Sequence, residues 1–265
     1  MSLTEPSSRA QAFVRRLAAI TEPEMQEALW AEQFETCPTD DLILLLSQLF
    51  AGVQRREEPY RTAYISLVIW LRQHSGRDTH GISRRAAEAH HERRRVIYEA
   101  ARERGDIDVM RLLLPTAPPP AAVATHIKEP QLGGEGREIT LGHRRMMART
   151  ADRTLLGRLL FDPDPVVLRH VLDHPLMVEQ DVIRVAARRP TLATCLEVVF
   201  GHPRWGRRGE VQKALLLNPY SPVDMGINLL PLMDTRTLKG VSYDGLLSEA
   251  LQRRARELLS NSQMH

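Results

Sequence analysis

The chain is poor in the residues that cross-link a protein or hold it in a membrane. Its only cysteines, Cys37 and Cys195, lie far apart in the sequence, so neither a disulfide framework nor a metal-binding cysteine pair is predicted. The amino terminus has no apolar stretch of signal-peptide length. The longest apolar run, Ile65 to Leu71, is far shorter than the roughly 20 residues that span a bilayer. These absences predict a cytoplasmic protein with reduced thiols and no membrane contact.

Catalytic motifs are also missing. The sequence contains no GxSxG, P-loop, GxGxxG or HExxH pattern. His170 and His174 are spaced to share a helical face, with Asp173 as a possible third metal ligand, but His174 stands beside Pro175, where a structural role at a helix end is favoured. We therefore predict a non-enzymatic protein with no cofactor and no bound metal.

Charge of one sign does not dominate. Lys and Arg number 36 against 33 Asp and Glu, a formal net charge of +3. This overall balance does not indicate a class of binding partner, although the many arginines allow local basic faces. The hydrophobic content of 43% is sufficient for a real core.

Residues 8–114 are predicted to form an amino-terminal helical unit. Pro23 suits a first helical position, Thr39 or Asp40 is a candidate N-cap, and Gly105 is expected to end one helix before the next begins at Asp106 or Asp108. The stretch 60–74 is apolar on nearly every side, which predicts a helix at the centre of this unit.

Residues 115–138 are rich in proline and then in glycine. Proline favours extended backbone and glycine favours flexibility, so this stretch is predicted to be a linker or long loop. It marks the clearest boundary in the sequence.

Beyond the linker, short helices are predicted at regular intervals. The expected ranges are 143–150, 153–161, 165–173, 177–188, 191–201, 207–217 and 222–233. Pro175, Pro190, Pro203 and Pro219 push the preceding residue out of helical geometry and so fix helix ends. Helices this short are marginal in water, so they are predicted to stack on one another.

An internal match supports repetition. The segment that starts at Val166 aligns without gaps with the one that starts at Glu210, and the match pairs Pro175 with Pro219. The offset of about 44 residues lies in the length class of HEAT and armadillo repeats, roughly 40 to 47 residues.

The segments DPDPVVLRHVLDHP and QKALLLNPYSP carry a resemblance to bacterial leucine-rich-repeat-variant and HEAT-like α-solenoids. It covers about residues 139–235. The resemblance implies an all-α fold with a curved helical-repeat scaffold that serves as an interaction surface, without chemistry of its own. Some members of the variant class hold an iron–sulfur cluster on clustered cysteines, which this chain lacks, so no cluster is expected.

The last part of the chain predicts one amphipathic helix that caps the stack, so the second unit is expected to span residues 139–259. Arg253, Arg254 and Arg256 are placed on the solvent side of this helix.

Arginines near the helix junctions form the candidate binding site. Equivalent positions of stacked helices align along one ridge, which predicts a positive strip. Its members are Arg144, Arg145, Arg149, Arg188, Arg189, Arg204, Trp205, Arg207 and Arg208.

Two functions follow from this organisation. The first is a protein–protein interaction scaffold, with a partner and an oligomeric state that the sequence does not identify. The alternative is a nucleic-acid-binding solenoid, in which the arginines contact phosphates and Trp205 stacks on a base.

Overall fold

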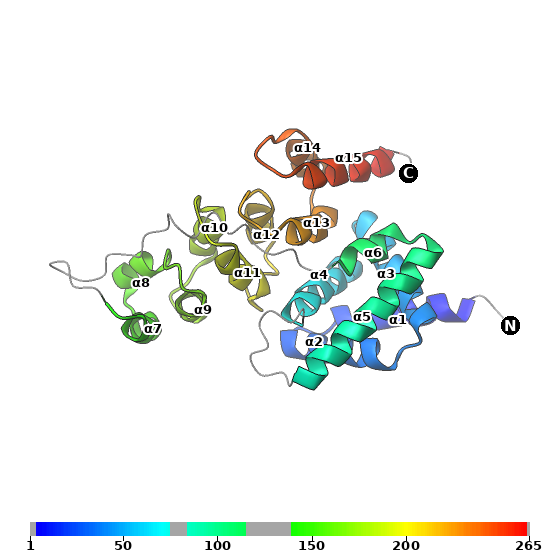
Figure 1. Ribbon diagram of the computed structural model, residues 1–265, viewed down its shortest axis with the longest axis horizontal. Helices are drawn as coiled ribbons and strands as arrows, with labels where there is room; N and C mark the ends of the chain where they lie inside the picture. Colours follow the sequence, from blue (N-terminus) through cyan, green and yellow to red (C-terminus); the bar gives the residue numbers. More distant parts are fainter. Residues whose placement is uncertain (1–3, 75–83, 115–138, 264–265) are drawn as a thin grey trace. The chain divides into compact units, whose positions relative to one another are not determined.

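The computed structural model describes residues 4–74, 84–114 and 139–263, and this part of the chain contains helices but no β-strand (Figure 1). The predicted all-α class is confirmed. The linker predicted at 115–138 lies outside the described residues.

The helices are α1 (Thr4–Ala18), α2 (Pro23–Thr36), α3 (Thr39–Gln54), α4 (Glu58–Gln73), α5 (Arg84–Arg104), α6 (Ile107–Leu112), α7 (Leu141–Thr150), α8 (Arg153–Leu159), α9 (Pro165–Asp173), α10 (Glu179–Ala187), α11 (Ala193–Gly201), α12 (Gly209–Leu216), α13 (Val223–Leu229), the 3-10 helix η3 (Leu230–Leu232), α14 (Thr235–Tyr243) and α15 (Glu249–Gln263).

The chain divides into two compact units. Unit 1 takes the described residues within Met1–Thr116, Ile227–Tyr243 and Ala250–His265, and unit 2 takes those within Ala117–Gly226 and Asp244–Glu249. This division differs from the predicted one, because α14 and α15 group with the amino-terminal helices and not with the short-helix stack. Both ends of the chain therefore build unit 1.

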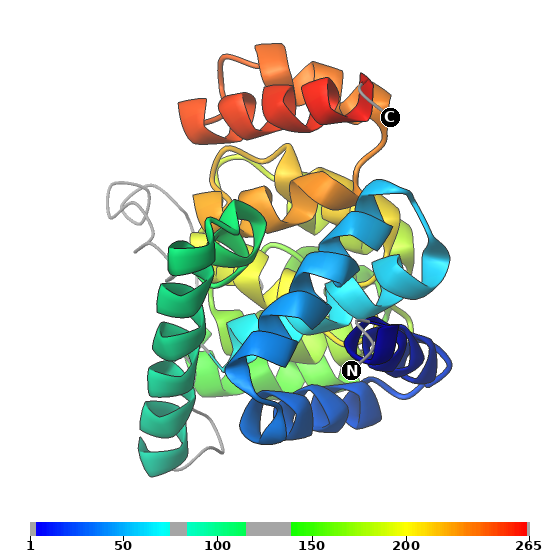
Figure 2. The ribbon, with the colours of Figure 1, turned by 90° about the vertical axis from the view of Figure 1, so that its right-hand side faces the viewer.

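The core of unit 1 is centred on α4, as its sequence predicts. Every residue from Ala63 to Leu71 is buried, and α4 contacts α1, α2 and α3. A hydrogen bond from Trp30 Nε1 to Ser66 Oγ, 2.8 Å long, joins α2 to α4 inside the core. Figure 2 shows the long helix α5, which contacts α3 and α6. Hydrophobic burial thus organises unit 1 around one central helix.

Helix ends in unit 1 follow local chemistry. Gly105 has a φ of 71° after the end of α5, a left-handed conformation that glycine adopts without strain. Asp106 caps α6 by accepting the amide of Val109 at 3.1 Å. The expected cap of α3, Thr39 or Asp40, is wrong: Pro38 occupies the N-cap position, and the Thr39 hydroxyl accepts a hydrogen bond from Arg93.

Two arginines of α5 tie helix ends together. Arg93 donates to the carbonyl oxygens of Phe34 and Cys37, at the carboxyl end of α2. Arg94 donates to the carbonyl oxygens of Leu71 and Leu113, which belong to the ends of α4 and α6. The last carbonyls of a helix have no partner within it, so these side chains supply what the backbone lacks.

The carboxy-terminal segment corrects two expectations. Arg254 was placed on the solvent side of the last helix, but it is 5% exposed and pairs with Asp108 of α6. The sequence also predicted a single helix after Asp234, whereas α14 precedes α15. Asp234 caps α14 by accepting the amide of Thr237 at 2.6 Å.

The helices of unit 2 alternate between two rows (Figure 1). Row A consists of α7, α9 and α11, and row B consists of α8, α10 and α12. Contacts within a row join each helix to the next but one in sequence: α7 to α9, α9 to α11 and α10 to α12. The short helices α7 to α12 begin and end within two residues of the predicted bounds, whereas the last, predicted over 222–233, is α13 followed by η3.

Helices within a row run parallel. In row A, Arg144 near the start of α7 pairs with Asp162 before α9, and Arg149 near the end of α7 contacts His170 near the end of α9. The turns that leave row A therefore gather at one edge of the stack, here named the first edge. The turns that leave row B gather at the opposite, second edge.

The row arrangement gives the repeat a different length from the expected one. Row neighbours begin 24 to 30 residues apart, and the pair Arg153 and Asp181, which joins α8 to α10, is 28 residues apart. The internal match at about 44 residues instead pairs α9 with α12, a helix of the other row. The match reflects similar turn chemistry at both edges.

Candidate interaction surface

A recurring turn shapes both edges of the stack. At each such turn, a side chain accepts the backbone N–H two residues later. Asp162 accepts from Asp164 at 2.9 Å, His174 from Leu176 at 3.2 Å, His202 from Arg204 at 3.2 Å, and Asn218 from Tyr220 at 3.0 Å. Proline follows each of these acceptors and prevents the helix from continuing. His174 thus holds its turn through an amide and not through the terminal carbonyls that its sequence position suggested.

Side chains in the turn after one helix also donate hydrogen bonds to the terminal carbonyls of its row neighbour. Trp205 Nε1 donates to the carbonyl oxygen of Leu172 at 2.9 Å, at the end of α9. Asn218 Nδ2 donates to the carbonyls of Ala186 at 2.7 Å and Arg188 at 2.9 Å, at the end of α10. Each donor satisfies a carbonyl that lacks an intrahelical partner, so these residues fix the row spacing.

Several of the predicted binding residues are part of this scaffold. Arg144 is buried and its Nε lies 3.4 Å from Asp162 Oδ2. Arg145 is 3.3 Å from Asp164, which also caps α9. Arg188 donates to the carbonyl of Phe161 and lies over its ring. These arginines have partners within the stack.

Trp205 does not fit the proposed stacking role. Its side chain is 1% exposed, and the Arg204 guanidinium lies over its ring, 4.1 Å from the centroid. A base has no access to this ring. The aromatic signal in the sequence therefore marked a core residue.

The remaining predicted arginines do not form one strip. Arg149, Arg204 and Arg208 are exposed at the first edge, where Arg207 is half-buried. Arg189 is exposed at the second edge and donates to the carbonyl of Leu217. Because consecutive turns lie at opposite edges, arginines at successive junctions are separated by the length of a helix.

A compact charged patch on row A includes residues outside the predicted arginine set. We name it the row A patch, and its members are Arg145, Arg149, Arg169, His170, Asp173 and Arg204. Arg149 contacts His170 Nε2 at 3.2 Å, and Asp173 Oδ1 lies 3.1 Å from His202 Nε2. In the sequence, His170 and Asp173 were considered only as metal ligands, and the one signal for Arg169 was its place next to His170.

The electrostatics of the patch are dominated by cations. Burial lowers the pKa of His170, and Arg149, Arg145 and Arg169 lower it further, against the opposite effect of Asp173. Burial also lowers the pKa of His202, although Asp173 opposes this. Both imidazoles are neutral near pH 7. Of the four arginines of the patch, Arg145 pairs with Asp164, while Asp173 contacts His202.

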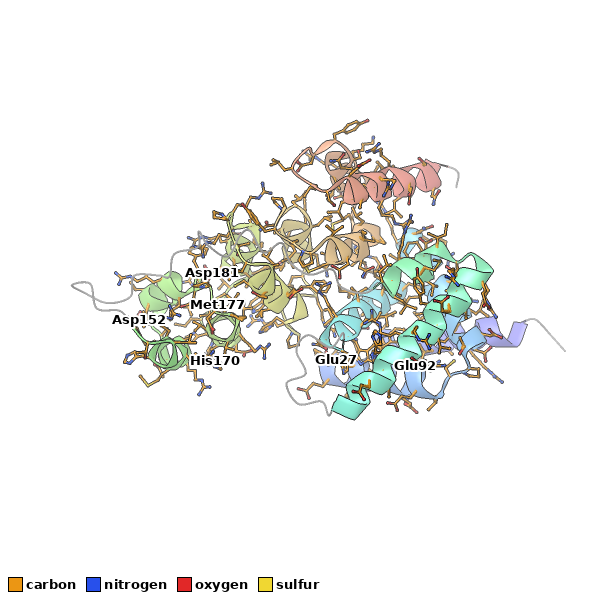
Figure 3. All side chains as sticks on the ribbon, in the orientation of Figure 1. Glu27, Glu92, Asp152, His170, Met177 and Asp181 are labelled. Carbon is orange, nitrogen blue, oxygen red and sulfur yellow. The ribbon has the colours of Figure 1, made fainter. Side chains whose placement is uncertain are left out.

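Row B is tied by a strong ion pair. Arg153 at the start of α8 donates to both oxygens of Asp181 on α10, at 2.6 and 2.9 Å. Figure 3 labels Asp181 on α10 and His170 on α9, in different rows. Hydrogen bonding to Arg153 lowers the pKa of Asp181. This pairing is structural, because the carboxylate is buried.

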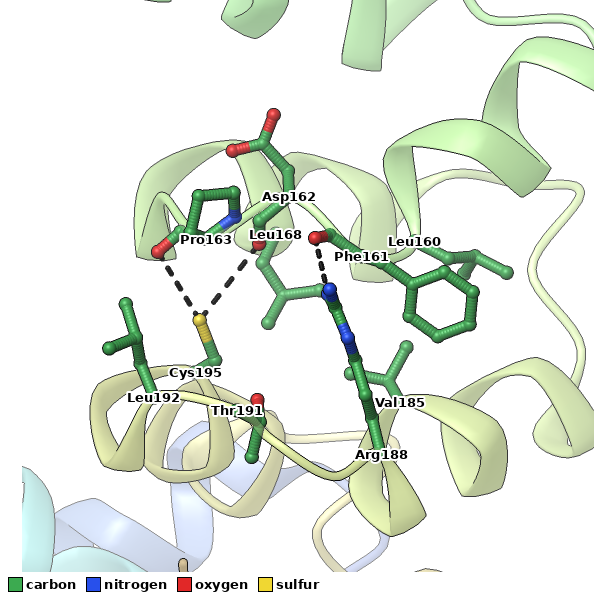
Figure 4. A pocket seen from close by; sticks show the side chains of 10 residues that line it. All are labelled: Leu160, Phe161, Asp162, Pro163, Leu168, Val185, Arg188, Thr191, Leu192 and Cys195. Atoms are coloured by element: carbon green, nitrogen blue, oxygen red, sulfur yellow. Dashed lines mark hydrogen bonds between the residues drawn. The ribbon is translucent and has the colours of Figure 1, made fainter. Parts of the chain in front are cut away.

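A small cavity lies near the second edge, lined among others by Phe161, Asp162, Arg188 and Cys195 (Figure 4). It has room for about one water molecule. The Cys195 thiol faces the carbonyl oxygens of Asp162 and Pro163, and burial raises its pKa to about 12. The cavity is too small for an organic substrate, and its thiol is not an activated nucleophile.

The described residues contain no group of three His, Cys, Asp or Glu side chains placed to hold a metal ion. In the same part of the chain, no helix combines the length and apolarity that crossing a membrane requires.

No protein-family model matches the sequence, and comparisons with curated proteins and with solved structures found no match either. The resemblance to leucine-rich-repeat-variant and HEAT-like proteins therefore remains a prediction based on turn chemistry.

Proposed function

We propose that residues 139–235 form a HEAT-like helical-repeat stack that acts as a non-catalytic scaffold for a partner protein. The observation that carries this proposal is the parallel packing of each short helix on the next but one, with turn side chains and carbonyl caps repeated along the rows. Such stacking leaves the outer face of each row free of neighbours from the same stack. The cytoplasmic location stays part of the proposal, and two free cysteines agree with it.

The nucleic-acid alternative has one supporting observation. Residues 139–226 contain thirteen Lys and Arg against nine Asp and Glu, so the stack is more basic than the rest of the chain. The separation of the predicted arginines between two edges and the burial of Trp205 weigh against it. A protein partner is the better-supported function.

Site-directed cross-linking tests the proposal. A photoreactive amino acid is placed in the full-length chain at exposed positions of row A, such as His143 or Thr194, with a matched position at Glu35 of unit 1 as the control. We expect protein adducts from the row A positions, unaffected by nuclease treatment and absent at Glu35. Adducts that disappear after nuclease treatment would favour the nucleic-acid function and reject the scaffold.

A further inference from the structure

The row A patch has the composition of a recognition surface for a protein. Arg149, Arg169 and Arg204 are exposed on three successive elements: α7, α9 and the turn after α11. Exposed apolar side chains flank them, with Met146 on α7 55% exposed and Leu176 after α9 47% exposed. Protein interfaces combine apolar contacts with arginine-rich polar ones.

The dimensions of the patch fit a short segment of chain. Packed helices lie about 8 to 10 Å apart, so three neighbouring helices of one row span roughly 16 to 20 Å. An extended peptide rises about 3.3 Å per residue, so about six residues reach from α7 to α11. Arg149, Arg169 and Arg204 give this span a positive charge, interrupted by Asp173 and by Asp164, which pairs with Arg145.

We infer that the row A patch binds an acidic segment of the partner protein, in which carboxylates pair with Arg149, Arg169 and Arg204 while apolar side chains contact Met146 and Leu176. This inference rests on the proposed scaffold function and specifies its partner. The bidentate geometry of arginine with carboxylates supplies the recognition.

Two features favour an acidic peptide over nucleic acid. Asp173 stands among the arginines, 61% exposed, and would repel a continuous row of phosphates, whereas a peptide can offer it a backbone or side-chain donor. The patch also has no exposed aromatic ring, since Trp205 is buried beneath Arg204. Single-stranded nucleic acids are usually held by stacking on such rings.

The test measures fluorescence anisotropy of the full-length protein with a labelled peptide of alternating glutamate and leucine. Labelled single- and double-stranded DNA oligonucleotides of equal charge are the comparison. The patch variant carries Arg169→Glu and Arg204→Glu. The control variant carries Arg158→Glu and Arg184→Glu, which change the net charge equally on exposed positions of row B.

We expect the peptide to bind the natural protein more tightly than either oligonucleotide. The patch variant should bind the peptide about 100-fold more weakly, roughly tenfold for each reversed arginine. The control should change affinity by less than about threefold at physiological salt, because the Debye length of about 8 Å screens charges that lie in the other row. Circular dichroism confirms that the variants fold, and the milder pair Arg169→Gln and Arg204→Gln should give a smaller loss.

Three results would overturn the inference: no peptide binding at low salt, an equal loss in the control variant, or tighter binding of an oligonucleotide than of the peptide. If any of these results were obtained while the cross-linking experiment still gave protein adducts at row A that resist nuclease, only the acidic partner would be rejected. The scaffold function would then be retained.

Discussion

The Asp173 carboxylate and the His202 imidazole join the end of α9 to the turn after α11, with Oδ1 3.1 Å from Nε2. His202 Nδ1 already accepts the amides of Arg204 and Trp205. The neutral ring therefore carries its proton on Nε2 and donates it to Asp173. One histidine thus holds a turn and a row contact at once.

Replacement of His202 tests whether it acts through the turn. His202→Leu leaves the amide of Arg204 without an acceptor and should cost roughly 1–3 kcal/mol of unfolding free energy. His202→Asn should cost less than half as much, because Asn218 holds the equivalent position at another turn. Urea denaturation measures both. Equal losses would show that the turn hydrogen bond to Arg204 contributes nothing measurable.

The buried pair of Arg144 and Asp162 predicts a non-additive result. Arg144→Met leaves the Asp162 carboxylate buried without its cation and should cost about 3–5 kcal/mol. Adding Asp162→Asn removes the uncompensated charge and keeps an acceptor for the amide of Asp164, so the double variant should recover part of the loss. A double variant less stable than Arg144→Met alone would contradict this account.

Arg254 and Arg253 offer a matched pair in unit 1. Arg254 is buried, pairs with Asp108 and Glu257, and lies 5.4 Å from the centroid of Phe50. Arg254→Ala should destabilise the protein by roughly 1–3 kcal/mol, because it removes a buried guanidinium and leaves Asp108 with only the more distant Arg111, 3.9 Å away. The exposed Arg253, changed to Ala, should stay within about 0.5 kcal/mol. Similar thermal melts for the two variants would refute the anchoring role of Arg254.

His90 should make unit 1 acid-sensitive. Its ring lies 4.8 Å from Trp70 and 5.4 Å from His74, between centroids, and burial lowers its pKa from 6.5 to about 4. Above pH 6.5 its contribution to stability is complete. As the pH falls from 6.5 to about 4, the unfolded chain binds a proton that the folded chain does not, and stability is lost.

We expect this effect to remove roughly 1–2 kcal/mol between about pH 7 and about pH 5, allowing for partial exposure of the ring. His90→Phe keeps an aromatic ring and should flatten that part of the pH dependence, measured by urea denaturation at both pH values. An unchanged slope would assign the acid sensitivity to other groups.

The two thiols should differ in reactivity. Burial raises the pKa of Cys195 to about 12, whereas Cys37 is half-buried and its pKa is raised less. Thiolate is the reactive form, so a thiol reagent should label Cys37 in the folded protein and Cys195 only on unfolding. Labelling of the folded protein should therefore be lost in Cys37→Ala. Rapid labelling of Cys195 in that variant would show that its cavity opens readily.

The sequence predicted helices well where their boundaries depend on local chemistry. Proline after His174, His202 and Asn218 ends a helix by sterics, whatever the rest of the chain does. The segment of α14 includes two Thr, one Gly and one Val, which are weak helix formers; it gave no comparable signal and was missed. Its Asp234 cap was the one local clue.

The candidate site was harder to predict because it depends on partners far away in sequence. An amphipathic pattern places Arg254 in solvent, but its partner Asp108 lies 146 residues earlier. In the same way, the sequence near Trp205, with three arginines, resembles a binding motif. The structure places Trp205 in the core, where its indole donates a hydrogen bond to Leu172, 33 residues away. Only Arg145, Arg149 and Arg204 of the predicted set belong to the row A patch.

The alternation of turns between two edges constrains how this stack can change length in evolution. Gain or loss of one helix would reverse the direction of every later helix and carry Arg204 to the side away from Arg149. Gain or loss of a helix pair would keep each residue on its own side. Homologues should therefore differ by insertions or deletions of 24 to 30 residues, the range of offsets between row neighbours.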